Sequence, residues 1–494
     1  MTARLICGDL DRSGDEVAQR ALQLAGGLAR LGVEDGDVMA VMLRNGPAFI
    51  DAIQSCQTAG CFYCPVNWHF KAEEVAFLLK DSAAKVFLVE ADLLDALEGA
   101  IPEGVTVLVN GASGGLTAGR LPYEAWLAEQ AVYEGEVRTP RTHMAYTSGT
   151  TGRPKGVKRM APPPEDREAL AVAIQALSRT TWGIEPGVRT LVSAPLYHSA
   201  PSSFAQQSIV QAELMVVMPR FDAEQTLALI QKHRIDTVFL VPIMYVRLLR
   251  LPEDVKAKYD LSSVRFVAST GAPCAPDVKL QMLDWWGPVI YETYASSETG
   301  MITIQDPISA RRKPGSVGRL IGETRIRIVD EEGNDCPQGE PGVIYVRQPA
   351  VPDFTYLNND EAREKAGLGD LVTVGDIGYM DEEGYLYICD RKSDMVISGG
   401  VNIYPAEIEH VLITLPGVID CAVVGIPDAE YGESLMAVVA APEGLLSAEQ
   451  VQQFVRERLA GYKVPRRVEL IESLPRDDNG KVAKRRLREL FVPS

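Results

Sequence analysis

Residues 146–156 read YTSGTTGRPKG and follow a short apolar and aromatic run at 144–146. Three glycines, four aliphatic hydroxyl side chains and the cation Lys155 stand within this stretch. Glycine lets a backbone turn with positive φ and approach an anion closely, while hydroxyl and N–H groups donate hydrogen bonds to its oxygens. The stretch therefore predicts a phosphate-binding loop rather than an ordinary polar surface loop. The residues that we expect to contact phosphate are Thr147, Ser148, Gly149, Thr150, Thr151, Gly152 and Lys155.

The loop does not match the Walker A pattern GxxxxGK[ST]. Gly149 and Gly152 are three positions apart, and Lys155 is followed by Gly156 instead of Ser or Thr. A simple P-loop nucleotide hydrolase is therefore disfavoured. The loop instead resembles the phosphate-binding motif of the adenylate-forming superfamily, which comprises acyl-CoA synthetases, adenylation domains of peptide synthetases and beetle luciferases.

Length and composition limit the class of protein. A chain of 494 residues is too long for one ordinary core, so we expect at least two domains. The net charge of −18 disfavours a nucleic-acid-binding surface, which needs clustered lysine and arginine. No apolar stretch approaches the ~20 residues that span a bilayer, and the first residues lack a signal-peptide core. Eight scattered cysteines, including a lone CxxC at Cys61 and Cys64, favour packed free thiols. We expect a cytoplasmic enzyme without nucleic-acid partners.

The pattern of apolar residues predicts an α/β fold. Ser13 and Glu16 form a capping-box signature before a helix, and apolar strand-like runs then alternate with amphipathic helices. The pattern recurs between 190 and 267, so we expect two α/β subdomains. Short strands separated by Gly and Pro between 315 and 390 indicate a small β-rich subdomain. Beyond a boundary near Arg391 a compact α+β unit begins, with a second capping box at Ser447 and Gln450. The expected domains are 1–390, which binds ATP and acid, and 391–494.

Three further segments match the superfamily in order along the chain. APLYHS places Tyr197 and His198 where the family has an aromatic or histidine residue beside the carboxylate pocket. STGAP resembles the turn against which the family lays adenine, and its members are Gly271, Ala272 and Pro273. In YETYASSETG the resemblance implies that Tyr294 stacks on adenine, Ser297 contacts the α-phosphate and Glu298 holds Mg²⁺. Ala295 and Ser297 replace the usual Gly and Thr, and serine keeps the hydroxyl.

The C-terminal third completes the resemblance. Asp376 has the place of the carboxylate that binds both ribose hydroxyls, with Arg391 beside it, and a carboxylate can accept two hydroxyl donors. Lys481 has the place of the catalytic lysine that bridges the substrate carboxylate and the α-phosphate. By resemblance the C-terminal domain is mobile, with a hinge near Ser393. It turns to present a glycine-bearing face to the pantetheine arm of CoA, and that face comprises Ser398, Gly399 and Gly400. We expect the other basic residues of the tail to form a solvated helix face; they are Lys484, Arg485, Arg486 and Arg488.

The resemblance implies an AMP-forming carboxylic acid:CoA ligase that uses ATP, Mg²⁺ and CoA. An acyl-adenylating enzyme that loads a carrier protein or an amine is the alternative. Luciferase-like oxygenation and a non-catalytic nucleotide sensor are remote. The segment APLYHSAPSSF holds no acidic residue to bind a substrate ammonium, which favours an uncharged acyl tail. A medium or long fatty acid, a ring-bearing acid and an aryl acid remain equally open. A homodimer is expected only because it is the commonest assembly.

Overall fold

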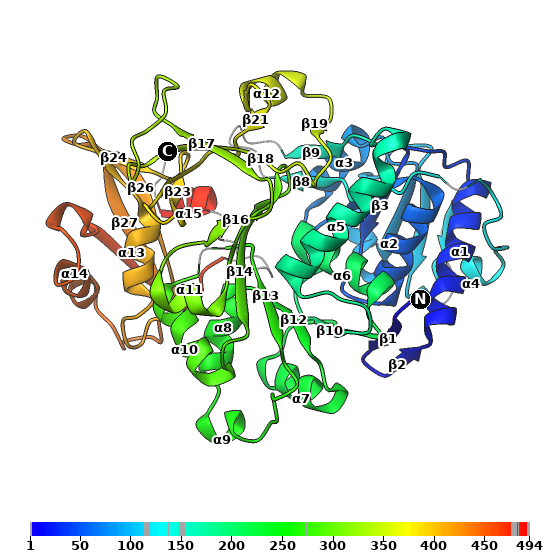
Figure 1. The fold of residues 1–494 in the computed structure, drawn as a ribbon, viewed down its shortest axis with the longest axis horizontal. Coiled ribbons are helices and arrows are strands. Elements are labelled where there is room, and N and C mark those ends of the chain that lie inside the picture. The colour runs from blue at the N-terminus through cyan, green and yellow to red at the C-terminus, as the bar shows by residue number, and fades with distance from the viewer. Residues whose placement is uncertain are drawn as a thin grey trace.

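The computed structural model describes residues 2–112, 116, 119–136, 138–147, 154–272, 274–475, 482 and 484–491. Within these residues the strands form five sheets (Figure 1). The α/β fold that the sequence predicts is confirmed, with two α/β layers, a β-rich region and a small C-terminal region. Among the described helices, none combines the length and apolar character that a bilayer crossing requires.

The largest sheet has nine strands in the order β16-β15-β14-β13-β12-β10-β11-β1-β2. Its central strands are parallel and almost completely buried, as expected for strands covered on both faces. Loops that follow β10, β13 and β14 therefore meet at one edge of the sheet, where ligands bind in open α/β folds. The bounds are β1 Arg4–Cys7, β2 Leu10–Arg12, β10 Arg189–Val192, β11 Leu214–Val217, β12 Thr237–Leu240, β13 Phe266–Ser269, β14 Ile290–Ser296, β15 Gly300–Gln305 and β16 Arg319–Leu320.

A second, five-stranded sheet lies in the N-terminal part and is parallel throughout, in the order β4-β3-β5-β6-β7. One apolar core contains residues of both sheets and of the helices between them, including Leu24 in α1, Phe204 in α6, Leu88 in β5 and Val216 in β11. The two layers are therefore packed as one body. The strand bounds are β3 Val38–Met42, β4 Phe62–Pro65, β5 Val86–Glu90, β6 Thr106–Asn110 and β7 Arg120–Pro122.

The first helix of this body begins where the sequence predicts. The Ser13 hydroxyl accepts a hydrogen bond from the Glu16 N–H, and the Glu16 carboxylate accepts one from the Ser13 N–H, which confirms the capping box. Helix bounds are α1 Gly14–Arg30, α2 Pro47–Ala59, α3 Ala72–Asp81, α4 Tyr123–Ala128, α5 Arg167–Trp182, α6 Ser199–Gln211, α7 Ala223–His233, α8 Pro242–Leu249, α9 Glu253–Lys256, α10 Pro276–Trp286 and α11 Pro307–Arg312. Short 3-10 turns lie at η1 Ala91–Leu93, η2 Asp95–Leu97, η3 Pro164–Asp166 and η4 Gly461–Lys463.

Two antiparallel sheets connect the phosphate-loop region to the C-terminal region. A three-stranded sheet in the order β19-β9-β8 joins the strands on either side of the loop to a strand two hundred residues later in the chain. The predicted β-rich region forms a six-stranded sheet, in which β22 pairs with β23. The bounds are β8 Ala145–Thr147, β9 Lys155–Arg159, β17 Arg325–Val329, β18 Gly342–Arg347, β19 Phe354–Tyr356, α12 Asp360–Lys365, β20 Gly367–Leu368, β21 Leu371–Val372, β22 Asp376–Met380 and β23 Leu386–Arg391.

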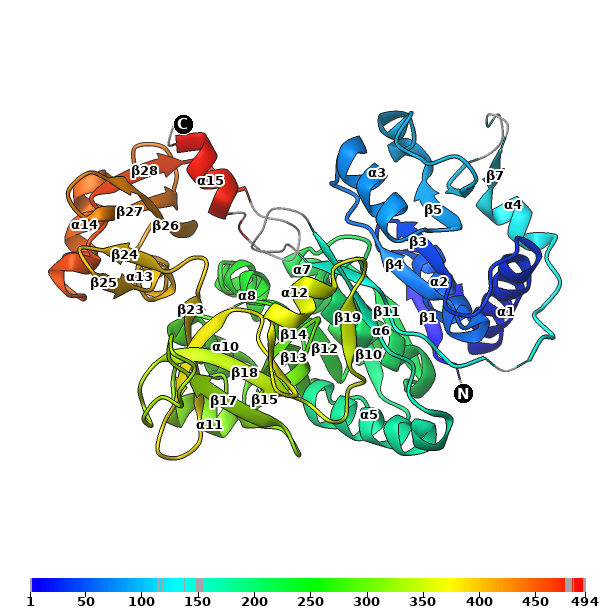
Figure 2. The ribbon, with the colours of Figure 1, turned by 90° about the horizontal axis from the view of Figure 1, so that it is seen from above.

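The C-terminal elements lie together at one end of the molecule, shown in orange and red in Figure 2. Their five-stranded sheet has apolar clusters of its own on both faces. The capping box of Ser447 and Gln450 is confirmed at the start of α14. Ser393 lies exposed in the turn 392–395 that joins β23 to this region. The bounds are β24 Val396–Ser398, β25 Val401–Ile403, α13 Pro405–Leu412, β26 Asp420–Asp428, β27 Gly432–Ala440, α14 Ala448–Arg456, β28 Arg467–Ile471 and α15 Lys484–Phe491.

The prediction of a solvated basic face on the last helix is wrong for Lys484. Its side chain is only 14% exposed, and its Nζ lies 2.8 Å from the Glu409 carboxylate of α13. Burial alone would lower the pKa of Lys484, but the charges of Glu409 and Asp390 outweigh burial and raise it. Arg486, by contrast, is exposed as expected. The helix packs across β26 through buried Leu487, which places Lys484 on its inner side.

Candidate active site

Glu298 lies where the phosphate loop meets the large sheet, in the turn between β14 and β15. Its side chain is only 8% exposed. The Thr147 hydroxyl, at the end of β8, and the Tyr356 hydroxyl, at the end of β19, each donate to Glu298 Oε1 at 3.2 Å. The Lys155 Nζ lies 5.0 Å from the centre of the Tyr356 ring, within cation–π range. Thr147 before the loop therefore binds the Glu298 carboxylate directly, and Lys155 after the loop lies against Tyr356, which binds the same carboxylate.

These surroundings fit Mg²⁺ as it binds to phosphates. Magnesium at such sites takes one or two carboxylates, and its remaining ligands are phosphate oxygens and water. Across the part of the chain that the structure describes, no three acidic, histidine or cysteine side chains gather into a metal centre. A metal held by Glu298 would therefore depend on the oxygens of a bound phosphate chain.

Ser297 joins the predicted nucleotide segment to the predicted acid-binding segment. Its hydroxyl lies 2.8 Å from the hydroxyl of Ser199, the first residue of α6. His198 immediately precedes that residue, and its ring centre is 4.4 Å from that of Tyr197. The Asn45 side chain holds the same loop in place, because it donates to the Ala194 carbonyl at 2.9 Å and accepts from the Leu196 N–H at 2.7 Å.

Tyr294 and Asp376 meet on the side predicted to bind adenosine. The Tyr294 hydroxyl donates to Asp376 Oδ2 at 2.5 Å, and Arg391 Nε lies 3.4 Å from Asp376 Oδ1. Burial, followed by the nearby Asp376 charge, raises the pKa of Tyr294 well above its ordinary value, so the phenol stays a donor. The three residues come from β14, β22 and β23, and β22 pairs Asp376 directly with Arg391. Stacking of the tyrosine ring on adenine stays a prediction.

The predicted adenine turn follows β13. Gly271 has a φ of +96°, in the region that favours glycine, and it is exposed. The Thr270 hydroxyl donates to the Thr293 carbonyl at 2.8 Å, which fixes the turn beside β14. Ala272 is half-buried next to it. Pro273 lies outside the described residues, as do Ser148, Gly149, Thr150, Thr151, Gly152 and Lys481.

The predicted CoA face lies elsewhere, in the hairpin of β24 and β25. Gly399 and Gly400 form its turn with φ of +58° and +81°. The Gly399 N–H donates to the Tyr431 carbonyl at 2.9 Å, so the hairpin is held within the C-terminal region. Ser398 pairs with Gly432 there. The structure thus brings together the residues around Glu298 and those around Asp376, and it places the Ser398 to Gly400 hairpin on the other region.

Two residues of this site, Tyr356 and Arg159, are not predicted by the sequence motifs. The Arg159 guanidinium donates to the Ser297 carbonyl at 2.6 Å and to the Pro352 carbonyl at 2.7 Å. Burial lowers its pKa to about 10, while the Glu298 charge acts in the opposite direction. Arg159 stands four residues after Lys155 on one strand, so both side chains leave the same face; that spacing was the available signal. Tyr356 shares a face with buried Phe354 by the same rule.

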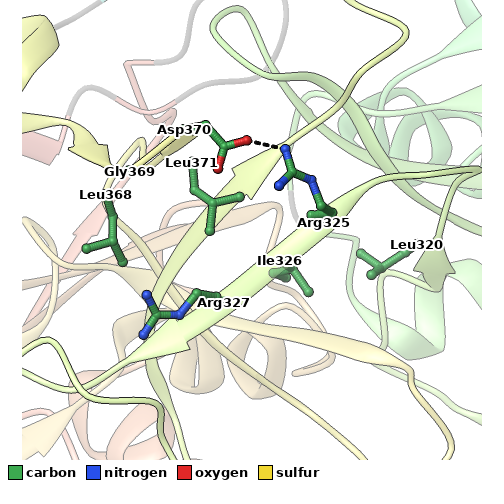
Figure 3. Close-up of a pocket in the computed structure, with 8 residues that line it drawn as sticks. All are labelled: Leu320, Arg325, Ile326, Arg327, Leu368, Gly369, Asp370 and Leu371. Atoms are coloured by element: carbon green, nitrogen blue, oxygen red, sulfur yellow. Dashed lines mark hydrogen bonds and ion pairs between the residues drawn. The ribbon is translucent and has the colours of Figure 1, made fainter.

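Two cavities lie away from these residues. One of about 600 Å³ lies between β17 and the strands β20 and β21, where Arg325 and Asp370 form an ion pair (Figure 3). Another of about 470 Å³ lies between α10 and residues 413–418 of the C-terminal region. No residue of the predicted site lines either one. Arg250 lines the second and donates to the carbonyls of Val418 and Ile419 at 2.8 and 2.9 Å.

Comparison with known proteins agrees with this arrangement. The model of the AMP-binding enzyme family matches residues 4–352, and that of the AMP-binding enzyme C-terminal domain matches residues 407–481. An indoleacetate–CoA ligase of Aromatoleum aromaticum is 34% identical over 98% of this chain and 94% of its own length. A 2-succinylbenzoate–CoA ligase of a Geobacillus strain is 31% identical over 96% of this chain and 92% of its own.

Among solved structures, the amide bond synthetase McbA from Marinactinospora thermotolerans superimposes with a TM-score of 0.84. It is 26% identical, over 99% of this chain and 97% of that one. The first family model spans the motif around Glu298, and both relatives match almost the whole length of this chain. The chain therefore belongs to the AMP-binding enzyme family, the adenylate-forming superfamily that its motifs resemble.

Proposed function

We propose that this protein is an AMP-forming carboxylic acid:CoA ligase. The acid attacks the α-phosphate of ATP to give an acyl adenylate and pyrophosphate, and the CoA thiol then displaces AMP. The observation that carries the proposal is that the hydroxyls of Thr147, at the start of the predicted phosphate loop, and of Tyr356 both donate to the carboxylate of Glu298, which we propose as the Mg²⁺ ligand. Both of the relatives described above are CoA ligases by name.

The chemistry explains why a nucleotide site is needed. A carboxylate is a poor acyl donor because its leaving group would be oxide, and adenylation makes that oxygen part of a good leaving group. Mg²⁺ would neutralise charge on the phosphate chain when held by Glu298. The phosphate loop and Lys155 would hold the departing pyrophosphate, Asp376 the ribose hydroxyls, and Lys481 the carboxylate and α-phosphate.

The acid would occupy the region that follows β10 and begins α6. Ser199 would border this acid-binding region on the nucleotide side, because its hydroxyl is hydrogen-bonded to that of Ser297. Phe204, further along α6, is a fully buried apolar residue. No acidic residue lies between 194 and 204. We propose a fatty, ring-bearing or aryl acid, and the acids named in the two relatives carry aromatic rings.

The two half-reactions would use two positions of the C-terminal domain. We propose that residues 391–494 turn about Ser393, presenting Lys481 first and the Ser398 to Gly400 hairpin second. Two features support this division: the connecting turn 392–395 includes an exposed Ser393, and the C-terminal region has its own apolar clusters. A cytoplasmic location and a homodimer complete the proposal, and light scattering of the purified chain would measure its mass directly.

An enzyme that transfers the acyl group to an amine or a carrier protein is the second candidate. The observation that favours it is the likeness to the amide bond synthetase McbA over almost the whole chain. The two candidates share the adenylation step and differ only in the acceptor.

Pyrophosphate and AMP release, measured with a panel of fatty, aryl-acetic and cinnamic acids, tests both candidates. A CoA ligase should release AMP over many turnovers only when CoA is present. Turnover that requires an amine or a carrier protein instead would establish the alternative. Absence of acid-dependent pyrophosphate release with every acid would contradict both.

A further inference from the structure

Arg159 is the last residue of β9, the strand that follows the phosphate loop, and its side chain links two other segments. Nη2 donates to the Ser297 carbonyl at 2.6 Å, and Nη1 donates to the Pro352 carbonyl at 2.7 Å. We infer that Arg159 is a positioning residue that holds Ser297 and Glu298 at a fixed place relative to the phosphate loop. The inference rests on the proposed function, because it assigns a task within the same site.

The surrounding sheet shows why this position matters. In the order β19-β9-β8 the strand of Arg159 is central. The two outer strands carry Tyr356 and Thr147, whose hydroxyls both donate to Glu298 Oε1. The central strand provides the bond to the carbonyl of the preceding residue, Ser297. All three strands therefore bind the short turn of Ser297 and Glu298. Strands β8 and β19 bind the Glu298 side chain, and β9 binds the Ser297 carbonyl.

An arginine suits this task better than a lysine. Its planar guanidinium presents several N–H donors in a fixed fork, so two carbonyls in different segments can be bound at once. A lysine ammonium is a compact charge on a flexible stem and does not reproduce that geometry. Burial lowers the pKa of Arg159 to about 10, which still leaves the side chain charged at neutral pH. Its positive charge is opposite to that of the largely buried Glu298 carboxylate.

Arg347 offers a matched comparison. It ends β18 and donates from Nη1 to the Gln348 and Val351 carbonyls at 3.2 and 3.1 Å. Like Arg159 it is a partly buried arginine that binds two backbone carbonyls, and like Arg159 it binds the 348–353 loop. Arg347 binds carbonyls of residues that follow it closely in the chain, whereas Arg159 binds the turn that carries Glu298. Loss of Arg347 should therefore change loop stability without moving Glu298.

The test compares Arg159→Met, Arg159→Lys and Arg347→Met in the full chain. For each variant, kcat and the KM for ATP come from acid-dependent pyrophosphate release, together with the Mg²⁺ concentration for half-maximal rate. Calorimetric titration with MgATP and the unliganded Tm provide readouts that do not need turnover. We expect Arg159→Met to lose about 10- to 100-fold in kcat and to need several-fold more Mg²⁺. Arg159→Lys should lie between it and the parent, and Arg347→Met should stay within about twofold of the parent.

Equal losses in Arg159→Met and Arg347→Met would overturn the inference, because they would indicate general loss of stability. Unchanged kcat and Mg²⁺ dependence in Arg159→Met would overturn it as well. If Arg159→Met does not fold, Arg159→Lys decides: a folded variant with the parent's Mg²⁺ dependence contradicts the positioning role. If the parent itself releases no pyrophosphate, the proposed function has failed, and calorimetry with MgATP still tests Arg159.

Discussion

The surroundings of Glu298 and the junction with the C-terminal region are built in opposite ways. The Ser297 to Glu298 turn is bound from β8, β9, β19 and α6 by side-chain hydrogen bonds of 2.6–3.2 Å. Contacts to the C-terminal region include a bond from the Ala406 N–H to Asp390 and those from Arg250 to two carbonyls. Bonds from many directions hold the turn in one arrangement, as electrostatic preorganisation requires. Such contacts, beside an exposed turn, suit a part that changes position.

Loss of Lys481 should have the largest effect, and only on one half-reaction. A charge pair at ~4 Å with an effective dielectric near 20 amounts to about 4 kcal/mol, or roughly a thousandfold in rate. We expect Lys481→Ala to lose about that factor in acyl-adenylate formation while thioester formation from preformed acyl-AMP continues. The measurement is pyrophosphate release beside thioester formation from synthetic acyl-AMP.

Arg486→Ala is the control for Lys481, since Arg486 belongs to the same basic tail and is exposed on α15. It should leave both half-reactions near the parent rate. Equal losses in both half-reactions of Lys481→Ala would mean that the lysine serves folding or general binding, and the contrast between a fixed and a moving region would lose its main support.

Removing the charge of Glu298 tests the role of the hydrogen-bonded turn that carries it. Glutamine keeps an oxygen that can accept from Thr147 and Tyr356, but it lacks the negative charge that favours a divalent cation. We expect Glu298→Gln to lose about a hundredfold in adenylation and to require a much higher Mg²⁺ concentration. Titration of the rate with Mg²⁺ measures both. A loss of rate with unchanged Mg²⁺ dependence would contradict the metal-binding role.

The sequence could predict features that lie within a short stretch of the chain. Ser13 with Glu16 and Ser447 with Gln450 are local signals, because each capping box lies within four residues, and both are confirmed. The family could be predicted because its motifs are contiguous stretches such as 146–156 and 291–300. The matches to the family models confirm it. Contacts between distant segments have no such local signal.

Lys484, Tyr356 and Arg159 illustrate what local patterns miss. The basic tail gave no sign that Lys484 would pair with Glu409, some seventy residues earlier, since charge runs are usually solvated. The bond of Tyr356 to Glu298 depends on strand β19 pairing with β9, two hundred residues away. Arg159 reaches Ser297 for the same reason. Such contacts depend on tertiary pairing, which periodicity along one strand does not specify.

A substitution of His143, which lies close to Arg159, should have a smaller effect, on the pH dependence of the free energy of unfolding. Burial, followed by the nearby Arg159 charge, lowers the pKa of His143 to about 4. An unfolded histidine titrates near ~6.5, so between about pH 6.5 and 4 the unfolded chain binds a proton that the folded chain does not. The free energy of unfolding therefore falls as pH decreases through this window.

We expect His143→Gln to remove this component. Between pH 8 and pH 5 the variant should lose about 2 kcal/mol less of its unfolding free energy than the parent. Urea unfolding at the two pH values measures the difference, in which contributions from other groups cancel. Equal losses in parent and variant would show that His143 is not held neutral beside Arg159, and the packing behind the phosphate loop would then be looser than the structure indicates.

Arg250 should have the smallest effect, because it lies at the junction and is exposed. Its Nη2 donates to the Val418 and Ile419 carbonyls, and a solvent-exposed charged contact contributes about 1 kcal/mol or less. Arg250→Met should therefore shift the balance between domain positions by roughly fivefold at most, measured by energy transfer between dyes on the two regions. Arg247→Met, an exposed change one turn earlier on α8, should leave that balance unchanged. A much larger shift with Arg250→Met would mean that one side chain holds the C-terminal region in place, and the junction would then resemble the surroundings of Glu298.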